Sequence, residues 1–552
     1  MAWVAALPMP AMAIDFGVHG YYRNRYEFSN DLDTQKTGTA FDNNRLGIIQ
    51  FSQMRLRTEP VVKLNDNLSL HAQFDFLDNL LFGSSNTEQL EILSPIVGTQ
   101  TLPAGPGSLG VVGGAAGENG SVNVRRVWAD ILVPFGKFRL GRQPSHWGLG
   151  IFQNDGAGFQ GDFGDSSDRV MFITQVPLKE TSALNAGLVW DTAFESQFDP
   201  SIQGLGGQIR DNGQDSQQYA LFLLYEEADW ELGTFSGIRR RDGSAGTTMT
   251  ANDALCVDEA NTPANCGIAS GIDGNTLMYF FDLYGRWTKD AYHFGLEGVY
   301  LGGKVTTGLA IDAIPFSVFD ETGEGIIQLP AKQDMQTYML AAEAGAYYPW
   351  GGEWEFKTGI ASGDKDPLST KITQFGFRPD YDIALLMFDV PLGTSPTIVD
   401  NNGVALSGGV PITGNFINNA LYVAATYKYH FEPEDVPQAN DFSVGGRIAT
   451  AWAPAKNINL DFGSVLGRTD LPAISETADS FFQRWYGFET DLIVDGRFYD
   501  YLRTALEIGV LFPSRAYDIE VNLTDPSGIV GTIPADKASF ALGARFTVAV
   551  EF

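Results

Sequence analysis

Residues 539–552 read SFALGARFTVAVEF and follow a strict two-residue period from Ser539 to Phe552. Every odd position is small, polar or charged, and the apolar even positions are Phe540, Leu542, Ala544, Phe546, Val548, Val550 and Phe552. Successive side chains of a β-strand point to opposite faces, so this segment predicts a strand with one apolar face. Soluble edge strands avoid such a row, whereas barrel strands in lipid turn it outwards. We therefore expect Phe546 and Phe552 to belong to a strand that closes a transmembrane barrel.

The same alternation recurs along the chain, in residues 14–28, 68–76, 126–133, 292–300 and 502–512. A helix would bring apolar residues round every three or four positions, which these segments do not do. The sequence contains no apolar run of about eighteen residues, as a membrane-spanning helix would need. No linker or change in composition divides the chain. We predict an all-β protein in which residues 14–552 form one antiparallel transmembrane barrel.

Connections between the expected strands alternate in length, which predicts their orientation. Short turns are expected at residues 65–67, 134–136, 227–229, 288–290, 350–352, 454–456 and 495–496. Long polar stretches are expected at residues 29–45, 78–120, 144–167, 194–215, 241–275, 303–333, 468–482 and 513–537. Outer-membrane barrels have short periplasmic turns, long extracellular loops and an even number of strands.

The expected strand number is about twenty, with eighteen as the alternative. The uncertainty lies in residues 364–416, where an even number requires one more strand, and Tyr381–Val390 (YDIALLMFDV) is the candidate. Barrels of this width leave an aqueous lumen unless something folds into it. We expect loops within residues 78–120, 144–167 and 364–416 to narrow that lumen.

The net charge of −31 comes from 67 acidic and 36 basic residues among 552. The acidic surplus lies in expected loops such as residues 162–168 (DFGDSSD), 320–324 and 432–435. These loops could bind divalent cations such as Ca²⁺. The alternative is a solvated acidic surface. No other cofactor and no metal site is expected. No nucleic-acid partner is expected either, since the sequence has no stripe of interleaved basic and aromatic residues.

The first thirteen residues, MAWVAALPMPAMA, are apolar and end in Ala-Met-Ala before Ile14. This resembles a signal-peptide cleavage site, although the basic start of a signal peptide is missing. We expect residues 1–13 to be a signal-peptide remnant, the alternative being an apolar leader that is retained. Cys256 and Cys266 are the only cysteines and are expected to form a disulfide in an oxidising compartment.

Charged residues on the polar strand faces are expected to line the pore. The basic ones form a stripe on neighbouring early strands, namely Arg23, Arg25, Arg55, Arg57, Arg126 and Arg139. The acidic ones are Asp75, Asp130, Glu489, Asp491 and Glu507, the last three on strands near the closing seam. Opposed charged walls create a transverse field that sorts charged solutes. The alternative is that arginine–carboxylate pairs only hold a wide barrel in shape.

Residues 126–150 (RVWADILVPFGKFRLGRQPSHWGLG) resemble a strand–turn–strand unit of bacterial porins and alginate-export-like outer-membrane channels. Residues 361–364 (ASGD) and 377–380 (FRPD) resemble a Gly-Asp plus Phe-x-Pro loop motif of the same channels. The resemblance implies a Gram-negative outer-membrane channel for passive diffusion of small hydrophilic solutes, anionic or carbohydrate. The implied partners are outer-membrane lipid, lipopolysaccharide and the barrel-assembly machinery.

Two other functions compete with the channel. A structural or surface-interaction barrel would be sealed by acidic loops that bind divalent cations. A barrel hydrolase acting on lipid would need a catalytic histidine, and His19, His71 and His146 are the candidates. Ser145 and His146 are adjacent and point apart on a strand, whereas a serine nucleophile and its base meet through the fold. We expect no enzyme.

Overall fold

The computed structural model describes residues 14–32, 34, 47–81, 122–194, 216–241, 249–251, 266–268, 276–306, 332–365, 370–393, 398–399, 405–407, 413–432, 434, 436, 438–455, 484–517, 519–525, 528–536 and 538–552. These residues are almost entirely strands and their connections. No helix within these ranges is long and apolar enough to cross a membrane.

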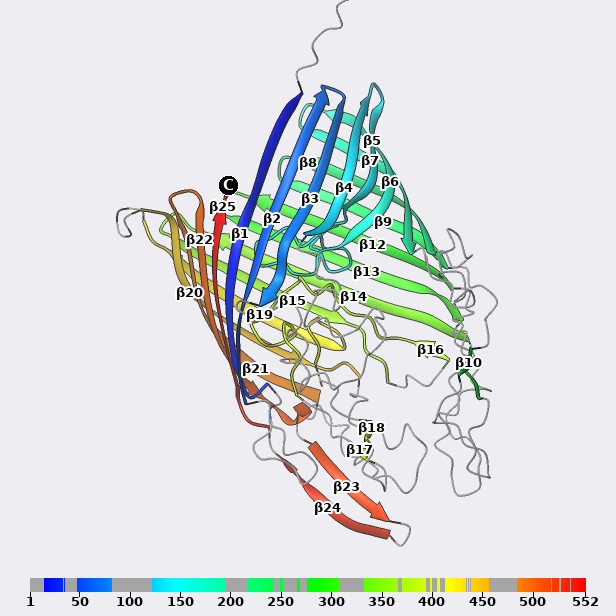
Figure 1. Cartoon of the computed structure of the whole chain (residues 1–552), viewed down its shortest axis with the longest axis vertical. Coiled ribbons are helices and arrows are strands. Elements are labelled where there is room, and N and C mark those ends of the chain that lie inside the picture. Colours follow the sequence, from blue (N-terminus) through cyan, green and yellow to red (C-terminus); the bar gives the residue numbers. More distant parts are fainter. Residues whose placement is uncertain are drawn as a thin grey trace, which may run out of the picture.

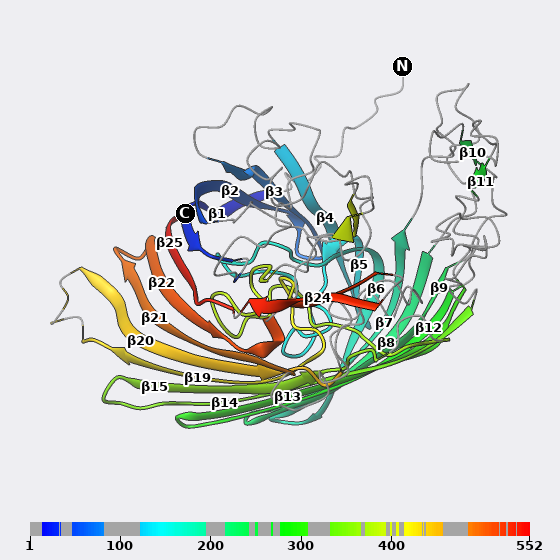
Figure 2. The ribbon, with the colours of Figure 1, turned by 90° about the horizontal axis from the view of Figure 1, so that it is seen from below.

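Eighteen antiparallel strands form one closed barrel (Figures 1 and 2). They are β1 (Asp15–Asn30), β2 (Ile48–Asn65), β3 (Leu68–Leu81), β4 (Val122–Val133), β5 (Gly136–Pro144), β6 (Ser166–Lys179), β7 (Ser182–Phe194), β8 (Ser216–Glu227), β9 (Trp230–Arg241), β12 (Thr276–Lys289), β13 (Tyr292–Thr306), β14 (Lys332–Tyr347), β15 (Gly352–Ala361), β19 (Ala420–His430), β20 (Ala439–Trp452), β21 (Trp485–Phe498), β22 (Leu502–Pro513) and β25 (Ala541–Glu551). The first and last of these strands pair and close the ring, from Tyr21 opposite Glu551 to Asn30 opposite Leu542. The backbone of Phe552 extends this seam by two hydrogen bonds to Gly20, of 2.9 and 3.0 Å.

Short connections join β2 to β3, β4 to β5, β6 to β7, β8 to β9, β12 to β13, β14 to β15, β19 to β20 and β21 to β22. They lie at the same end of the barrel as the start of β1 and the end of β25. The predicted turns at residues 454–456 and 495–496 are wrong. Residues 454–455 belong to the long connection after β20, and residues 495–496 lie inside β21, which turns at residues 499–501.

The structure has eighteen strands, the alternative count, and the prediction of a strand at residues 381–390 is wrong. This segment lies inside the barrel as part of the connection between β15 and β19 (Figure 2). Its side chains from Ile383 to Phe388 are at most 3% exposed. A loop packed against the inner wall needs the same apolar residue types as a strand, so the composition of this segment did not distinguish the two.

The two faces of the wall differ as the alternation predicts. On β1, Tyr22 and Tyr26 are 36% and 40% exposed on the outside, while Arg23 and Arg25 are 0% and 3% exposed on the inside. On β25, Phe546 is 44% exposed on the outside. A closed barrel satisfies its backbone hydrogen bonds internally, and an apolar outer face suits lipid. The architecture is that of an outer-membrane barrel.

Smaller elements lie among the long connections. They are β10 (Met249–Ala251), β11 (Cys266–Ile268), β16 (Lys371–Ile372), β17 (Ile398–Val399), β18 (Ala405–Ser407), η6 (Arg515–Tyr517), β23 (Ile519–Asp525) and β24 (Gly528–Asp536). Cys266 begins β11, but Cys256 and residues 1–13 lie outside the described residues. The disulfide and the signal-peptide remnant therefore stay predictions.

Candidate functional site

Two inward-folded segments cross the barrel interior. Loop A comprises residues 145–165, between β5 and β6, and loop B comprises residues 370–393, within the connection from β15 to β19. Both run inside the ring of strands in Figure 2. The sequence predicted loops of this kind at residues 144–167 and 364–416. The third predicted loop, residues 78–120, lies mostly outside the described residues.

Three arginines of the predicted basic stripe converge on one carboxylate of loop A, Asp162. Arg23 and Arg55 reach Asp162 Oδ1 at 2.8 and 3.1 Å, and Arg25 reaches Oδ2 at 2.5 Å. Burial alone would raise the pKa of Asp162, but the positive charges of the arginines hold that pKa well below its usual range. Arg55 also donates to the carbonyl oxygen of Gly161 at 2.7 Å. The stripe therefore holds the tip of loop A against β1 and β2.

Asp75 on β3 is the second carboxylate that binds arginines near loop A. Arg57 binds both oxygens of Asp75, at 2.7 and 2.8 Å, and Arg125 approaches from β4 at 3.3 Å. Arg125 also donates to the carbonyl of Phe163 at 2.9 Å. Arg126 donates to backbone carbonyls of loop A at 2.6 and 3.0 Å.

Sequence reasoning missed Arg125, because alternation places Arg125 and Arg126 on opposite faces. The register between β3 and β4 shifts after Gln73, which pairs with Arg126, while Phe74 pairs with Val124. The extra residue of this bulge is Arg125, so two consecutive arginines reach the interior. The polar Arg-Arg pair in an otherwise alternating strand was the available signal.

Arg139 stands apart from the rest of the stripe. It lies near the short turn after β4, where it binds both oxygens of Asp130 at 2.6 and 2.8 Å. Its guanidinium also lies 5.5 Å from the centre of the Trp128 ring. Arg23, Arg25, Arg55, Arg57 and Arg126 are at most 4% exposed. Their pore-lining role, like that of Arg139, stays a prediction. Their contacts anchor loop A through Arg23, Arg25, Arg55 and Arg126, whereas Arg57 contacts Asp75 on β3.

Two of the three predicted acidic residues near the seam, Glu489 and Asp491, hold loop B. Glu489 accepts the backbone N–H groups of Leu386 and Met387, each at 2.7 Å. Asp491 accepts that of Leu385 at 3.3 Å and is paired with Arg447 at 2.7 Å. These three successive amides point at two carboxylates on β21, so loop B is fixed to this wall by its backbone.

Glu507 on β22 lies at the edge of the same group, 4.0 Å from Arg447. It contacts neither loop in the part of the chain that the structure describes. Its pore-lining role stays a prediction, as do those of Asp75, Asp130, Glu489 and Asp491.

Small residues on the inner wall make room for loop B. Gly509 and Gly543 face each other on β22 and β25. A Cβ at Gly543 would come 2.5 Å from Leu386 Cδ2, and one at Gly509 would come 3.2 Å from Leu385 Cβ. Buried alanines continue the small-residue surface, namely Ala341, Ala361, Ala420, Ala424, Ala449, Ala451 and Ala541.

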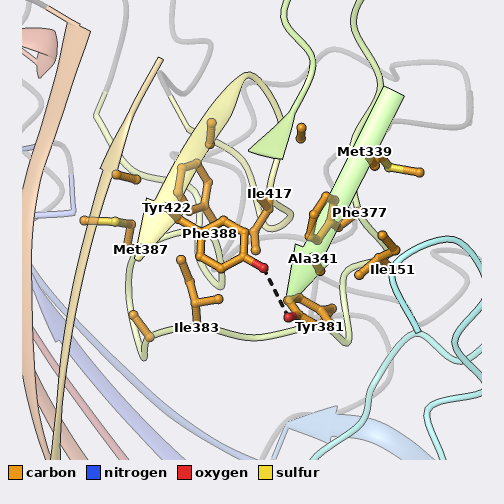
Figure 3. Close-up of a cluster of buried hydrophobic side chains, with 14 of the residues drawn as sticks. Ile151, Met339, Ala341, Phe377, Tyr381, Ile383, Met387, Phe388, Ile417 and Tyr422 are labelled. Atoms are coloured by element: carbon orange, nitrogen blue, oxygen red, sulfur yellow. Dashed lines mark hydrogen bonds between the residues drawn. The ribbon is translucent and has the colours of Figure 1, made fainter. Parts of the chain in front are cut away.

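Loop B is also packed through an apolar cluster that includes loop A (Figure 3). Tyr381 and Tyr422 join their hydroxyl groups at 3.1 Å, and Phe377 packs edge-on against both rings. Ile151 of loop A belongs to the same cluster, and its carbonyl accepts the backbone N–H of Arg378 at 2.9 Å.

Asp380 of loop B binds the tip of loop A directly. Its carboxylate accepts the backbone N–H groups of Asp162, Phe163 and Gly164, at 2.9, 3.2 and 2.6 Å. Gly156 lies beside this carboxylate with φ of 60°, and a Cβ there would come 2.8 Å from Asp380 Oδ2. Arg378, two residues before Asp380, forms an ion pair with Asp165 of loop A. The two loops therefore act as one body across the lumen.

A charged group lies where loop B meets the seam. Arg545 on β25 binds Asp389 at 2.5 Å and lies 3.6 Å from Glu27 on β1. Burial raises the pKa of Asp389, and burial together with the charge of Asp389 raises that of Asp382 well above its usual range. Acidic and basic side chains therefore meet where loop B contacts β25.

Among the residues that the structure describes, the three candidate histidines have no contacts that form a catalytic relay. His71 Nε2 lies 2.9 Å from Ser69 Oγ and 3.9 Å from Asp130 Oδ2. Both contacts use the same ring nitrogen, whereas a relay uses one nitrogen for the nucleophile and the other for the carboxylate. His19 lies 3.1 Å from Glu59, and His146 lies 3.7 Å from Asp155.

The acidic segment at residues 162–168 has protein partners for its charges. Asp162 contacts three arginines, Asp165 contacts Arg378, and Asp168 pairs with Arg142 at 2.7 Å on the outer face of the barrel. No cluster of three or more metal-binding side chains occurs in the described ranges. The acidic residues 320–324 lie outside those ranges, so Ca²⁺ binding stays a prediction.

No protein-family model matches the chain, and no curated protein matches it. Solved outer-membrane barrels are similar over almost the whole length. OmpT, an outer membrane protein of Vibrio cholerae, is 10% identical with a TM-score of 0.33, covering 98% of each chain. The anion-selective porin from Comamonas acidovorans is 10% identical with a TM-score of 0.35, covering 98% of this chain and 100% of the porin. Pseudomonas aeruginosa OccK9 (OpdG) is 11% identical with a TM-score of 0.41, covering 98% and 99%.

Proposed function

We propose that this protein is an outer-membrane channel through which small hydrophilic solutes diffuse passively. The observation that carries the proposal is a closed barrel of eighteen strands whose lumen is crossed by two loops. Barrels of about sixteen or more strands are wider than their own side chains can fill. Loop A is attached to β1 and β2, and loop B is attached to the nearby strands β21 and β25 and to loop A. We propose that a narrowed passage remains beside the two loops.

The ion pairs of the basic stripe affect which solutes the proposed channel would prefer. Four carboxylates, those of Asp162, Asp75, Glu27 and Asp78, lie at ion-pair distances from the four arginines Arg23, Arg25, Arg55 and Arg57. Charges neutralised at such short range contribute little to the field at the passage. We therefore propose small solutes, with anionic and carbohydrate molecules as the first classes to test, rather than a long polyanion. The likeness to alginate-export channels stays a prediction.

The proposal includes the partners of the barrel in the outer membrane. We propose that the exposed apolar side chains of the outer face contact outer-membrane lipid and lipopolysaccharide, and that the barrel-assembly machinery inserts the chain. The exposed rings of Tyr279 and Trp190, 47% each, are of the kind that outer-membrane barrels turn to lipid.

Single-channel recording in planar bilayers tests this function. Folded protein should give stepwise conductance, and the current should fall when sugars or polymers small enough to enter are added. Reversal potentials in a salt gradient report the preferred charge. Folded protein that gives no conductance would contradict the channel and favour the sealed structural barrel, whose loops calcium would protect from protease.

A further inference from the structure

The first residues of loop A are seated in a socket on the wall opposite β1 and β2. Trp147 packs against Phe222, Phe235 and Tyr284, with ring centres 5.8–6.4 Å apart. Gly233 on β9 and Gly295 on β13 provide the space. A Cβ at either position would come 2.8 Å from Trp147 and from Leu149, respectively.

Two carboxyl groups form the floor of this socket. Asp282 on β12 and Glu297 on β13 are both 0% exposed. They are diagonal neighbours across the strand pair, since Glu297 faces Tyr284 and Asp282 faces Val299. Their carboxyl groups are within hydrogen-bonding reach of each other. Glu297 Oε2 also accepts the backbone N–H of Leu149.

Within the described ranges, both oxygens of Asp282 and Oε1 of Glu297 are buried without a hydrogen bond of standard geometry. The donors beside the pair are the indole N–H of Trp147 near Asp282 and the backbone N–H groups of residues 149–151 near Glu297. An ionised carboxylate only accepts hydrogen bonds, so two of them in contact need a positive particle between them. Leaving both charged in a dry site would be strongly unfavourable.

No basic side chain of the described residues neutralises the pair. Neither carboxyl group forms an ion pair with Lys, Arg or His of the described chain. The titratable groups on the surrounding elements have other partners, namely Tyr284 with Glu231 at 3.0 Å, Glu343 with Lys357 at 3.4 Å, Tyr422 with Tyr381 at 3.1 Å and His146 with Asp155 at 3.7 Å.

We propose that Asp282 and Glu297 bind one proton between them, and that this shared proton keeps the start of loop A latched to the wall. The protonated carboxyl donates to the other, which leaves Glu297 Oε2 free to accept the Leu149 amide. At alkaline pH hydroxide takes the shared proton and becomes water, and two buried negative charges then face each other. They separate or draw in water, the socket loosens, and loop A becomes mobile at its Trp147 end.

Infrared spectroscopy of the folded protein tests the proton directly and does not depend on channel activity. The wild type should show a protonated-carboxyl band at neutral pH that disappears as the pH rises. Asp282→Asn and Glu297→Gln should each lose the part of that band that comes from the pair at neutral pH. Asp495→Asn is the matched control, because Asp495 is paired with Lys428 at 2.6 Å and should leave the band unchanged. Other buried carboxyl groups such as Asp382, whose pKa is raised by burial, keep their bands in every variant, so the measurement is the difference between the wild-type and variant spectra. Variants that lose no part of the wild-type band, or the absence of any such band from the wild type, overturn the proposal.

Proteolysis of loop A tests the latch. The wild type should lose protection of residues 145–165 at alkaline pH. Asp282→Asn should keep it, because the amide donates a hydrogen bond to Glu297 at every pH. An equal loss of protection in the wild type and in Asp282→Asn would overturn the latch. A failed channel assay with an intact infrared result would contradict the proposed function alone.

Discussion

Asp380 of loop B accepts a hydrogen bond from the backbone of Gly164 in loop A at 2.6 Å, across 216 positions of sequence. The same carboxylate also binds the amides of Asp162 and Phe163. Asp162 is in turn the residue that Arg23, Arg25 and Arg55 hold. A continuous polar connection therefore runs from the β1–β2 wall through loop A to loop B.

Replacing Asp380 with alanine should separate the two loops. Hydrogen bonds to a charged group contribute about 1.5–3 kcal/mol each, so the loss of this acceptor should free the tip of loop A. Single-channel recordings should show a larger and noisier conductance than the wild type.

Asp168→Asn is the control for this substitution. Asp168 carries a comparable charge on the outer face, paired with Arg142, and exposed pairs contribute little. Its conductance should match the wild type. An unchanged conductance in Asp380→Ala would show that this contact does not set the width of the passage.

Replacing Arg55 and Arg57 with glutamate should change both selectivity and loop position. The sequence predicts a reversal potential shifted towards cations. Losing the contact of Arg55 with Asp162 adds a loss of loop anchoring, because breaking a buried ion pair costs about 3–5 kcal/mol. Conductance should rise, and protease should cut loop A faster.

Arg139→Glu separates the two effects. Arg139 pairs with Asp130 far from loop A, so its replacement should leave loop A protected. If the double variant showed an unchanged reversal potential with a higher conductance, Arg55 would act as an anchor and neither arginine would be part of the permeation path.

The anchor of loop A should persist in acid. The pKa of Asp162 lies well below 3.8 because three arginines favour its charged form. A group with a lowered pKa keeps its full contribution above the pKa of the unfolded chain and loses it only as the pH falls through its own lower pKa. Hydrogen exchange of residues 159–164, corrected for the intrinsic rate, should stay slow from about pH 7 to about pH 4. Asp162→Asn should raise that exchange at every pH, and faster exchange of the wild type at pH 5 would refute this assignment.

Replacing Gly543 with leucine should push loop B off the wall. A Cβ there already meets Leu386 at 2.5 Å, and overpacking costs about 1–3 kcal/mol. The variant should show faster proteolysis of residues 381–388 and an altered conductance. Gly17→Leu is the control, since a Cβ at Gly17 meets no atom within 4 Å. Equal behaviour of the two variants would mean that loop B does not rest on this glycine pair.

Alternation by itself determined the barrel. Phe546 on β25 and Tyr22 on β1 lie on the outer face because a strand has two faces and only the apolar face is stable against lipid. The same rule placed Arg23, Arg55 and Glu489 inside. Leu140 and Arg142 are two positions apart on β5, so alternation places them on one face, and the structure has both exposed on the outer face.

Only the tertiary structure decided what fills the barrel. The apolar run at residues 381–390 has no period that separates a strand from a packed loop, and its identity follows from Gly543 and Glu489, which lie more than a hundred residues away in sequence. Arg125 turned inwards because of a register shift between two strands, which one strand cannot encode. The pairing of Asp380 with loop A joins segments that local sequence does not connect, because contacts across a lumen depend on where the closed wall brings them.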